Sequence, residues 1–305
     1  MPCWTVGHTN RPMSSFRRRA APRWAPEPPV RLPPGRVVHV PDRGEYFVRD
    51  TGGDGTPLLL LHGWTASADL NWFLQYDALR EAGYRVIALD HRGHGRGLRT
   101  YADFRLHDCA DDAVALLEQL GAGPAVAVGY SMGGPIALLA ARRHLDAIAG
   151  VVLCATSSNW RAPRLRGLWW SMSLFRLWLG LAPYEVWRGG LRLAGLPDTP
   201  ETTWVASELV RGSSRDIAEA GRELGRFDAR PWLREIRPPA AVVLTREDTG
   251  VPPRWQRSLA AGLGAPVFES PGDHLAASRE PEGFNRALLA ALSHVSARPE
   301  VPAAA

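Results

Sequence analysis

Short, uninterrupted apolar runs alternate with amphipathic stretches along most of the chain, and this alternation restricts the possible folds more than any other feature. The clearest run is Leu58-Leu59-Leu60-Leu61. A strand with no polar face must be covered on both sides, as in a parallel sheet that carries helices on each face. Strands and helices that alternate in this way predict a parallel, doubly wound α/β sheet.

The pattern also gives positions for the elements. We predict strands at residues 36–40, 45–49, 58–61, 84–89, 125–129, 148–155, 240–245 and 266–269. We predict helices at residues 69–82, 108–120, 131–144, 252–262 and 281–295. Gly83 and Gly121 stand at the ends of the first two helical patterns, which is typical of a helix C-terminus.

Between residues 156 and 230 the alternation stops, and helical patterns continue there without a convincing buried strand. Six of the twelve tryptophans fall in this stretch: Trp160, Trp169, Trp170, Trp178, Trp187 and Trp204. We therefore predict an α/β core over residues 35–156 and 231–298, with a helical cap over 157–230. Residues 1–34 are rich in proline and arginine and lack the apolar stretch of an export signal, so we predict a disordered extension.

Gly129-Tyr130-Ser131-Met132-Gly133 matches Gly-x-Ser-x-Gly between a predicted strand and a predicted helix. This context is what a nucleophile elbow requires. The turn is so sharp that side chains two residues before and after the serine would clash, and glycine at both positions removes them. A capping serine in a glycine-rich turn is the alternative, which the strand and helix on either side disfavour. The elbow predicts Ser131 as the nucleophile, placed at a helix N-terminus where backbone N–H groups can stabilise an oxyanion.

A serine nucleophile needs a general base, and the elbow implies the chain order serine, acid, histidine. Beyond the predicted cap, His274 and His294 are the histidines that remain. His274 lies in a loop after a short predicted strand, which suits a catalytic base, whereas His294 falls within the last predicted helix. His144 ends an earlier helix, where a cation interacts favourably with the helix dipole. We therefore predict His274 as the base.

The acid that orients this histidine is expected in the loop after a late strand. Asp248 follows the strand at 240–245 and would hold one imidazole tautomer and stabilise the imidazolium. Its rivals are the adjacent Glu247 and also Asp228, which falls in the predicted cap. For the oxyanion hole, the backbone N–H groups of Trp64 and Met132 are the candidates, because Trp64 follows the strand at 58–61.

These motifs make the chain resemble the α/β-hydrolase family, in its large group with a helical cap. The resemblance is carried by Leu61-His62-Gly63-Trp64, Asp90-His91-Arg92-Gly93-His94-Gly95, Gly129-Tyr130-Ser131-Met132-Gly133-Gly134 and Gly272-Asp273-His274. It implies a mostly parallel sheet of the eight-stranded type and hydrolysis by a serine triad without a cofactor. Epoxide hydrolases and haloalkane dehalogenases of this fold carry aspartate at the elbow, where this chain has Ser131.

Several activities share a serine triad on this fold, and the motifs do not separate them. Esterases, lipases, thioesterases, lactonases, carbon–carbon bond hydrolases and cofactor-free haloperoxidases all do so. We expect cleavage of a carboxylic ester, with the other chemistries as alternatives, and a non-catalytic ligand-binding or signalling protein as the competing class. The predicted cap is the clue to substrate, because Trp169, Trp170 and Trp178 would line an apolar pocket for a lipophilic acyl or aromatic ester.

Charge and cysteine content limit the partners. The chain has a formal net charge of +5, and every basic residue is arginine. These arginines are scattered outside any known nucleic-acid-binding module, so we expect no nucleic-acid partner. Cys3, Cys109 and Cys154 lack metal-ligand or redox spacing, which predicts no metal site and favours a reducing, cytoplasmic location. The partner expected is a small lipophilic ester, with peripheral membrane contact through the cap as a further option and the oligomeric state open.

Overall fold

The computed structural model describes residues 26–296 of the chain. At its centre is an eight-stranded sheet in the order β1-β2-β4-β3-β5-β6-β7-β8. The strands are β1 Gly35–Val40, β2 Gly44–Asp50, β3 Pro57–Leu61, β4 Arg85–Leu89, β5 Ala125–Tyr130, β6 Ile148–Cys154, β7 Ala240–Thr245 and β8 Val267–Ser270. Strand β2 pairs antiparallel with β1 and β4, and all other neighbours are parallel. The predicted mostly parallel α/β sheet is confirmed.

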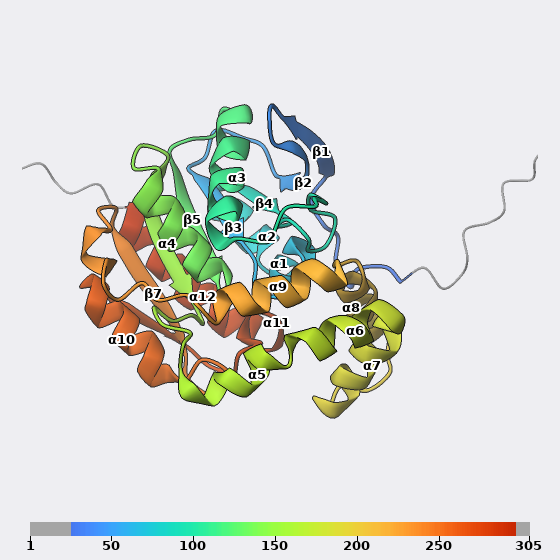
Figure 1. Ribbon diagram of the computed structural model, residues 1–305. Coiled ribbons are helices and arrows are strands. Elements are labelled where there is room, and N and C mark those ends of the chain that lie inside the picture. The colour runs from blue at the N-terminus through green and yellow to red at the C-terminus, as the bar shows by residue number, and fades with distance from the viewer. Residues whose placement is uncertain (1–25, 297–305) are drawn as a thin grey trace, which may run out of the picture.

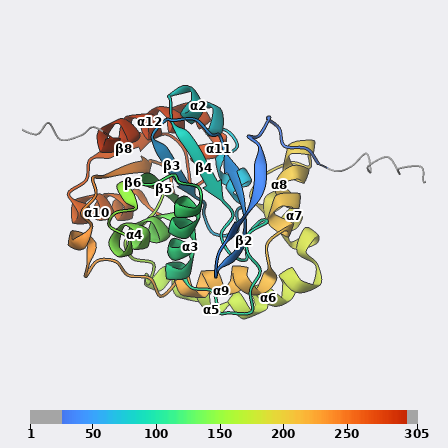
Figure 2. The same ribbon diagram turned by 90° about the horizontal axis from the view of Figure 1, so that it is seen from above.

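Helices cover both faces of this sheet. They are α1 Ala68–Trp72, α2 Tyr76–Glu81, α3 Leu106–Gln119, α4 Gly133–Arg143, α5 Arg166–Trp170, α6 Met172–Leu181, α7 Pro183–Leu193, α8 Pro200–Val210, α9 Ser214–Leu224, α10 Pro253–Leu263, α11 Ala276–Arg279 and α12 Pro281–Ser296, with 3-10 turns η1 Pro163–Leu165 and η2 Leu233–Glu235. Helices α3, α4 and α10 lie on one side, and α2, α11 and α12 on the other (Figures 1 and 2).

The four leucines of β3 explain why this strand has no polar face. Leu59 and Leu61 belong to the apolar cluster that includes residues of α3 and α4. Leu58 and Leu60 belong to a second cluster, with residues of α1, α2 and α12. Because successive side chains of a strand point to opposite faces, the run fills both cores of the doubly wound sheet.

The helix predicted at 69–82 is two helices, α1 and α2, and side chains from the far end of the chain account for the break. Asn285 on α12 donates through Nδ2 to the carbonyl of Leu74, at 3.1 Å. The buried amide of Gln75 donates to the carbonyl of Ala277 at 2.8 Å and to Asn285 Oδ1 at 3.1 Å. These contacts occupy the turn at 73–75, so tertiary hydrogen bonds override a pattern that is helical by itself.

The predicted N-terminal extension needs one correction. Residues 1–25 lie outside the described part of the chain, but residues 26–34 are described and contact the core. Leu32 packs against the apolar cluster under α12, and the Pro33 carbonyl accepts a hydrogen bond from the Arg49 guanidinium. The prediction of disorder up to residue 34 is therefore wrong for these two residues, because the Leu32 side chain packs on the core and the Pro33 carbonyl accepts a hydrogen bond from it.

Helices α5–α9 stand between β6 and β7, in the stretch where the strand–helix alternation stops; we call them the inserted helices. They contribute no strand to the sheet. Figure 1 shows them gathered along one side of the sheet, with α9 next to the core and α6 and α7 outside it. Across residues 26–296, no helix combines the length and the apolar character needed to cross a bilayer.

A buried charge network joins the inserted helices to the core. Glu208 on α8 is 4% exposed and accepts a hydrogen bond from Ser67 Oγ at 2.8 Å. The guanidinium of Arg96 lies 3.3 Å from Glu208 and 2.6 Å from Asp69, which in turn receives two hydrogen bonds of 2.7 Å from Arg49. Removing one partner from such a buried pair leaves an uncompensated charge, which costs about 3–5 kcal/mol.

Candidate active site

Strand β5 ends in a sharp turn that presents Ser131. Ser131 has φ of +51°, in the left-handed region that only a strained turn imposes on a serine. A Cβ on Gly129 would lie 2.3 Å from the carbonyl oxygen of Gly133, and one on Gly133 would lie 2.0 Å from that of Leu61. Both glycines are therefore required by close backbone approach, as the motif predicts.

The structure brings Ser131, His274 and Asp248 into one hydrogen-bonded chain. Nε2 of His274 lies 3.0 Å from Ser131 Oγ, and Nδ1 lies 2.7 Å from Asp248 Oδ2. The Asp248 side chain is fully buried, whereas a third of the His274 side chain is exposed. Since Asp248 can only accept a hydrogen bond when ionised, Nδ1 carries the proton and Nε2 is free to accept one from the serine.

Asp248 is held by groups that sequence analysis did not single out. Its Oδ1 accepts the backbone N–H of Val251 at 2.7 Å, and its Oδ2 accepts the Thr245 hydroxyl at 3.0 Å. Gln256, fully buried on α10, donates to Thr245 Oγ1 at 2.9 Å and to the Val251 carbonyl at 2.8 Å. A spacing of eight residues between an acid and a glutamine carries no recognisable motif, so the sequence could not have revealed this support.

The rival residues lie elsewhere. Glu247 is exposed, and Asp228 forms a salt bridge with Arg230 at 2.7 Å. His294 on α12 packs against Phe268 of β8, and His144 pairs with Asp111 at 2.7 Å. The geometry therefore favours Asp248 and His274 over every alternative that the sequence left open.

Tyr130, next to the serine, supports the loop that carries the histidine. Its hydroxyl donates to the backbone carbonyl of His274 at 2.8 Å, and its side chain is buried between His274 and Phe284. The two residues are 144 positions apart in the chain. Tyr130 fills a variable position of the elbow pattern, and so the motif gave no sign of this contact.

The loop after β3 lies beside the serine, as predicted. A Cβ on Gly63 would lie 3.3 Å from Ser131 Cβ, while the Gly63 N–H is held by Asn71 Oδ1 at 2.8 Å. Among the described residues, the backbone N–H groups of Trp64 and Met132 donate to no protein acceptor. Both remain available for a negatively charged oxygen.

The side chain of Trp64 connects this loop to the inserted helices. Its indole N–H donates to the carbonyl of Ile217 on α9 at 2.8 Å. Its ring meets Trp169 and Phe175 edge-on, with centroid distances of 5.7 and 6.1 Å. Trp64, Trp169 and Phe175 thus form one aromatic cluster on the loop after β3.

Of the three tryptophans predicted to line a substrate pocket, Trp169 is the one that is buried against the loop after β3. Trp169 is 9% exposed and packs on Trp64. Trp170 and Trp178 are 86% and 54% exposed, so neither is a pocket wall next to Ser131, and the prediction is corrected for both. The reason is helical periodicity, which turns Trp169, Met172 and Leu179 inward and leaves Trp170 and Trp178 on the outer face.

Three buried histidines lie behind the oxyanion loop. The ring of His62 is 4.2 Å from that of His91 and 5.5 Å from that of His94. His62 accepts the His91 backbone N–H at Nε2, so its Nδ1 carries the proton and donates to the Gly63 carbonyl at 2.8 Å. Burial lowers the pKa of His91 to about 3 and that of His94 to about 4, and it lowers the pKa of His62 as well. All three are neutral at physiological pH.

Within residues 26–296, one group of side chains has the spacing of a metal site, namely His107, Asp108 and Asp111 on α3. Asp108 already pairs with Arg92 at 3.0 Å, and Asp111 pairs with Arg143 at 2.9 Å. These arginines supply the positive charge that a metal ion would provide, so the donor set fits a salt-bridge network.

Comparison with known proteins identifies the family and agrees with the fold. A family model described as "alpha/beta hydrolase fold" matches residues 56–278. The chain is 31% identical over 258 residues to a protein of Variovorax paradoxus (strain S110), RutD, whose name designates a candidate carbamate hydrolase; the match covers 82% of this chain and 96% of that protein.

Two further similarities are more limited. The chain is 37% identical over 118 residues to a "Bifunctional esterase/perhydrolase DCH" of Acinetobacter calcoaceticus, over 38% of this chain and 42% of that protein, so less than half of that relative is spanned. The solved structure of a bromoperoxidase from Bacillus anthracis superposes with a TM-score of 0.75 at 21% identity, over 85% of this chain and all of that chain.

Proposed function

The chain belongs to the alpha/beta hydrolase fold family, and from this membership we propose that it is a serine hydrolase that cleaves a carboxylic ester through an acyl-enzyme at Ser131. The observation that carries the proposal is the chain of hydrogen bonds from Ser131 through His274 to the buried Asp248. A protein that only binds a ligand has no need of a nucleophile, a base and an orienting acid in hydrogen-bond sequence.

In the acylation half of the reaction, Nε2 of His274 takes the proton of Ser131 Oγ as that oxygen attacks the ester carbonyl carbon. The carbonyl oxygen becomes negatively charged and accepts hydrogen bonds from the N–H groups of Trp64 and Met132. His274 then gives its proton to the departing alcohol, and the acyl group stays on Ser131. Asp248 remains ionised and stabilises the imidazolium throughout.

In the deacylation half, water attacks the acyl carbonyl and His274 accepts its proton. The tetrahedral intermediate collapses, the proton returns to Ser131 Oγ, and the carboxylic acid leaves. The name of the esterase/perhydrolase relative supports a variant of this step. Hydrogen peroxide would replace water as the attacking group, and the acyl-enzyme would yield a peracid in place of the acid.

The side chains around Ser131 support a lipophilic acyl group. Trp64, Trp169 and Phe175 form an aromatic cluster on the loop after β3, whose Gly63 adjoins Ser131. An apolar wall of this kind distinguishes substrates by about 1–3 kcal/mol per methylene, so the preference for chain length should be graded.

The test combines covalent labelling with turnover. An organophosphate should add once to the wild-type protein, and peptide mass mapping should find it on Ser131. Ser131→Ala should take no label and lose turnover of p-nitrophenyl esters, while it keeps the melting temperature of the wild type. A panel with matched thioester, lactone and carbamate substrates, with and without hydrogen peroxide, then ranks the alternative chemistries. Turnover near the wild-type level in Ser131→Ala would exclude the proposed nucleophile.

A further inference from the structure

The outer face of the inserted helices is apolar, although the fold does not require it to be. Exposed large side chains follow one another along it: Leu168, Trp170, Leu174, Leu177, Trp178 and Leu181. Trp170 is 86% exposed and Leu181 is 70% exposed. The opposite face of α6, with Met172 and Leu179, is the buried one. Helix α6 is thus apolar on two faces, and its outer face is left in contact with solvent.

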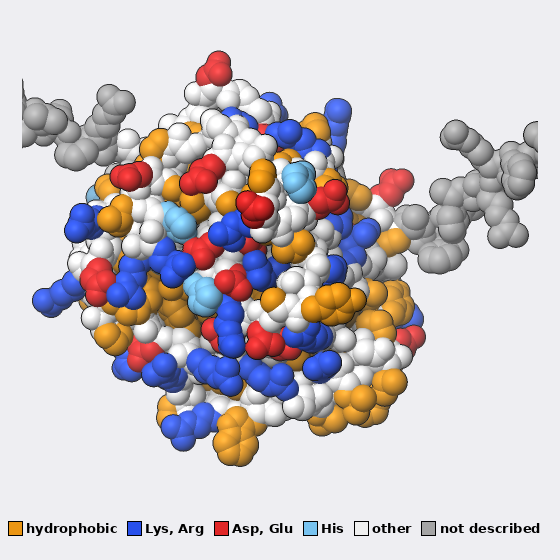
Figure 3. Space-filling model, turned by 45° about the horizontal axis from the view of Figure 1, so that its top comes forward, with side chains coloured by type: hydrophobic (Ala, Val, Ile, Leu, Met, Phe, Trp, Pro, Cys, Tyr) orange, Lys and Arg blue, Asp and Glu red, His pale blue; other side chains and the backbone are white. Residues whose placement is uncertain are grey.

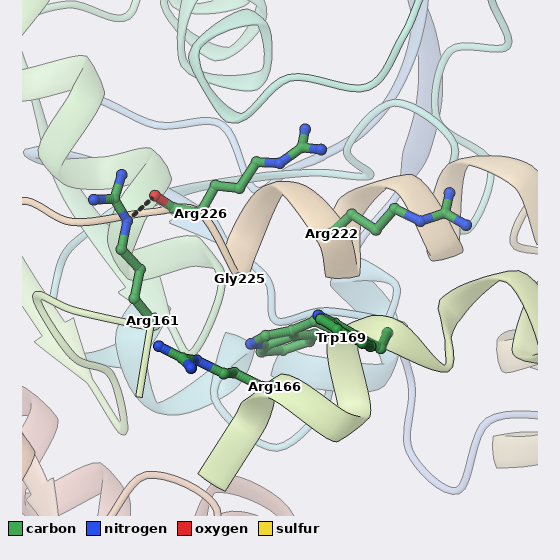
Figure 4. A pocket seen from close by; sticks show the side chains of 7 residues that line it. Arg161, Arg166, Trp169, Arg222, Gly225 and Arg226 are labelled. Carbon is green, nitrogen blue, oxygen red and sulfur yellow. Dashed lines mark hydrogen bonds between the residues drawn. The ribbon is translucent and has the colours of Figure 1, made fainter. Parts of the chain in front are cut away.

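A pocket rich in arginine adjoins this face. It has a volume of about 540 Å³ and is lined by Arg161, Arg166, Arg222 and Arg226, with Trp169 and Trp170. Figure 4 shows Arg161 and Arg166 on one side and Arg222 and Arg226 on the other, where α9 ends. Ser131, Asp248 and His274 do not line it, and Trp169, which packs on Trp64, is the residue that it shares with the aromatic cluster.

The positive charge in this pocket is poorly compensated. Within the described part of the chain, Arg161, Arg166 and Arg222 form no salt bridge; Arg161 donates to the Arg226 carbonyl at 2.7 Å and Arg222 to the Ser173 hydroxyl at 2.7 Å. Arg226 lies 3.8 Å from Glu223, a long contact. Elsewhere on the surface arginines pair closely, as Arg257 does with Glu269 at 2.8 Å. No guanidinium group of the pocket is therefore held by a close carboxylate, which leaves N–H donors for an anion.

The segment from η1 through α6 contains no negative charge. From residue 161 to residue 184 it includes four arginines and neither aspartate nor glutamate. Figure 3 shows hydrophobic side chains gathered at the lower edge of the molecule, with basic side chains next to them. Exposed tryptophan and leucine beside unpaired arginine are the features of a protein surface that lies in a membrane interface.

We propose that α5–α7 dock on an anionic phospholipid bilayer, with the arginine pocket holding a lipid phosphate and the exposed tryptophan and leucine side chains entering the acyl boundary. A guanidinium group matches phosphate by paired hydrogen bonds, and its aliphatic stem can lie along apolar surface. The helices lie in the plane of the interface, since none is long and apolar enough to cross. Docking does not depend on Ser131 being a nucleophile.

The positive charge of the arginine pocket argues against a second copy of this chain as the partner that covers the apolar face. A two-fold dimer places the same surface patch on both sides of the interface. Here that would bring the arginines of one copy against those of the other. No acidic residue lies between 161 and 184, and of the two acids near the pocket, Asp228 is already paired with Arg230 and Glu223 lies 3.8 Å from Arg226. An anionic bilayer offers the opposite charge together with an apolar layer.

Sedimentation with vesicles tests the proposal in the full-length protein. The protein should sediment with vesicles of phosphatidylcholine and phosphatidylglycerol, and should stay in solution with phosphatidylcholine alone. Added salt should weaken binding, and an excess of free glycerol phosphate should change it little. Arg166→Glu should lower the partition coefficient at least about fivefold, since each arginine near an anionic surface contributes about 1 kcal/mol. Trp170→Ser should lower it as well.

Two matched variants control for net charge and for lost aromatic surface. Arg237→Glu, at an exposed position between η2 and β7, changes the charge equally, and Tyr101→Ser removes a ring that is 99% exposed outside the patch. Both should bind as the wild type does, and all four variants should keep the wild-type melting temperature and turnover of a water-soluble ester.

Four results would overturn the proposal. They are no sedimentation with either vesicle, equal binding to uncharged vesicles, anionic binding that survives both Arg166→Glu and Trp170→Ser, or competition by free glycerol phosphate. A concentration-dependent dimer that Trp170→Ser dissociates would assign the face to self-association.

Discussion

Asp248 shows at the scale of single residues how geometry separates two neighbours that the sequence leaves as rivals. Asp248→Asn should keep the fold and lose about 10⁴-fold in kcat, because an amide in place of the acid favours the wrong imidazole tautomer. Glu247 is the matched control, since it is exposed one position away and Glu247→Gln should keep wild-type kcat. Steady-state kinetics on one p-nitrophenyl ester measure both. Loss of activity in Glu247→Gln alone would reassign the acid.

Tyr130 offers a second test at this scale. Tyr130→Phe removes the hydrogen bond to the His274 carbonyl, so we expect about 1 kcal/mol less stability and a lower kcat with little change in KM. Tyr76→Phe is the control, because the Tyr76 hydroxyl is buried without a partner among the described residues. Urea denaturation and the split of kcat against KM are the measurements. Equal effects of the two variants would mean that the His274 carbonyl contact has no role in positioning the base.

The nucleophile, base and acid could be predicted because each lies in a short segment that indicates its role without information from elsewhere in the chain. The elbow needs five consecutive residues, and His274 and Asp248 each follow a recognisable strand. Gln256 and Tyr130 could not be predicted, since their partners are set by how α10 and the His274 loop pack, and no local pattern encodes that.

At the scale of elements, the faces of α5 and α6 decide which tryptophans can affect substrate choice. Trp169→Leu should shift the ratio of kcat/KM between long and short acyl esters, by about tenfold per methylene of altered fit. Trp178→Leu should leave that ratio unchanged, because the ring is on the outer face. The ratio is measured over a chain-length series and cancels any difference in folded fraction. Equal shifts in both variants would contradict the orientation of these helices.

Helices α5 and α6 also show where sequence patterns no longer predict which side of an element is buried. Strand positions were predicted to within about one residue for most strands, because a buried parallel strand is apolar throughout. Helices α5 and α6 are apolar on both faces, so periodicity could not tell the inner face from the outer one. The division of 69–82 into α1 and α2 depends on Asn285, which lies more than two hundred positions away.

For the whole molecule, the three buried histidines predict how stability depends on pH. In the unfolded chain they titrate near pH 6.5, whereas in the folded chain the pKa values of His91 and His94 are about 3 and about 4. The unfolded state therefore binds more protons below pH 6.5, and folding becomes less favourable as the pH falls, by up to about 1.4 kcal/mol per pH unit for each histidine. Stability above pH 6.5 is unaffected by these groups.

Asp90 acts in the opposite direction, because burial raises its pKa to about 6 and the folded protein holds that proton longer than the unfolded chain. Two carboxyl groups with a raised pKa, those of Asp90 and Asp216, oppose three histidines, so the urea midpoint should still fall between pH 7 and pH 5. His91→Phe should reduce the slope, since both ring nitrogens of His91 lack partners among the described residues. An unchanged midpoint from pH 7 to pH 5 would contradict the burial of this cluster.

Glu208 also has a consequence for motion. Its carboxylate ties α8 to Ser67 and Arg96 of the core, and α9 is tied to Trp64, so lifting either helix would leave a buried charge or an indole without its partner. Helix α7 contains no buried residue and has no such anchor. Local fluctuation should therefore be concentrated in α7, while α8 and α9 keep their contacts with the core. Amide hydrogen exchange should show this as two rate classes, fast in α7 and slow in α8 and α9.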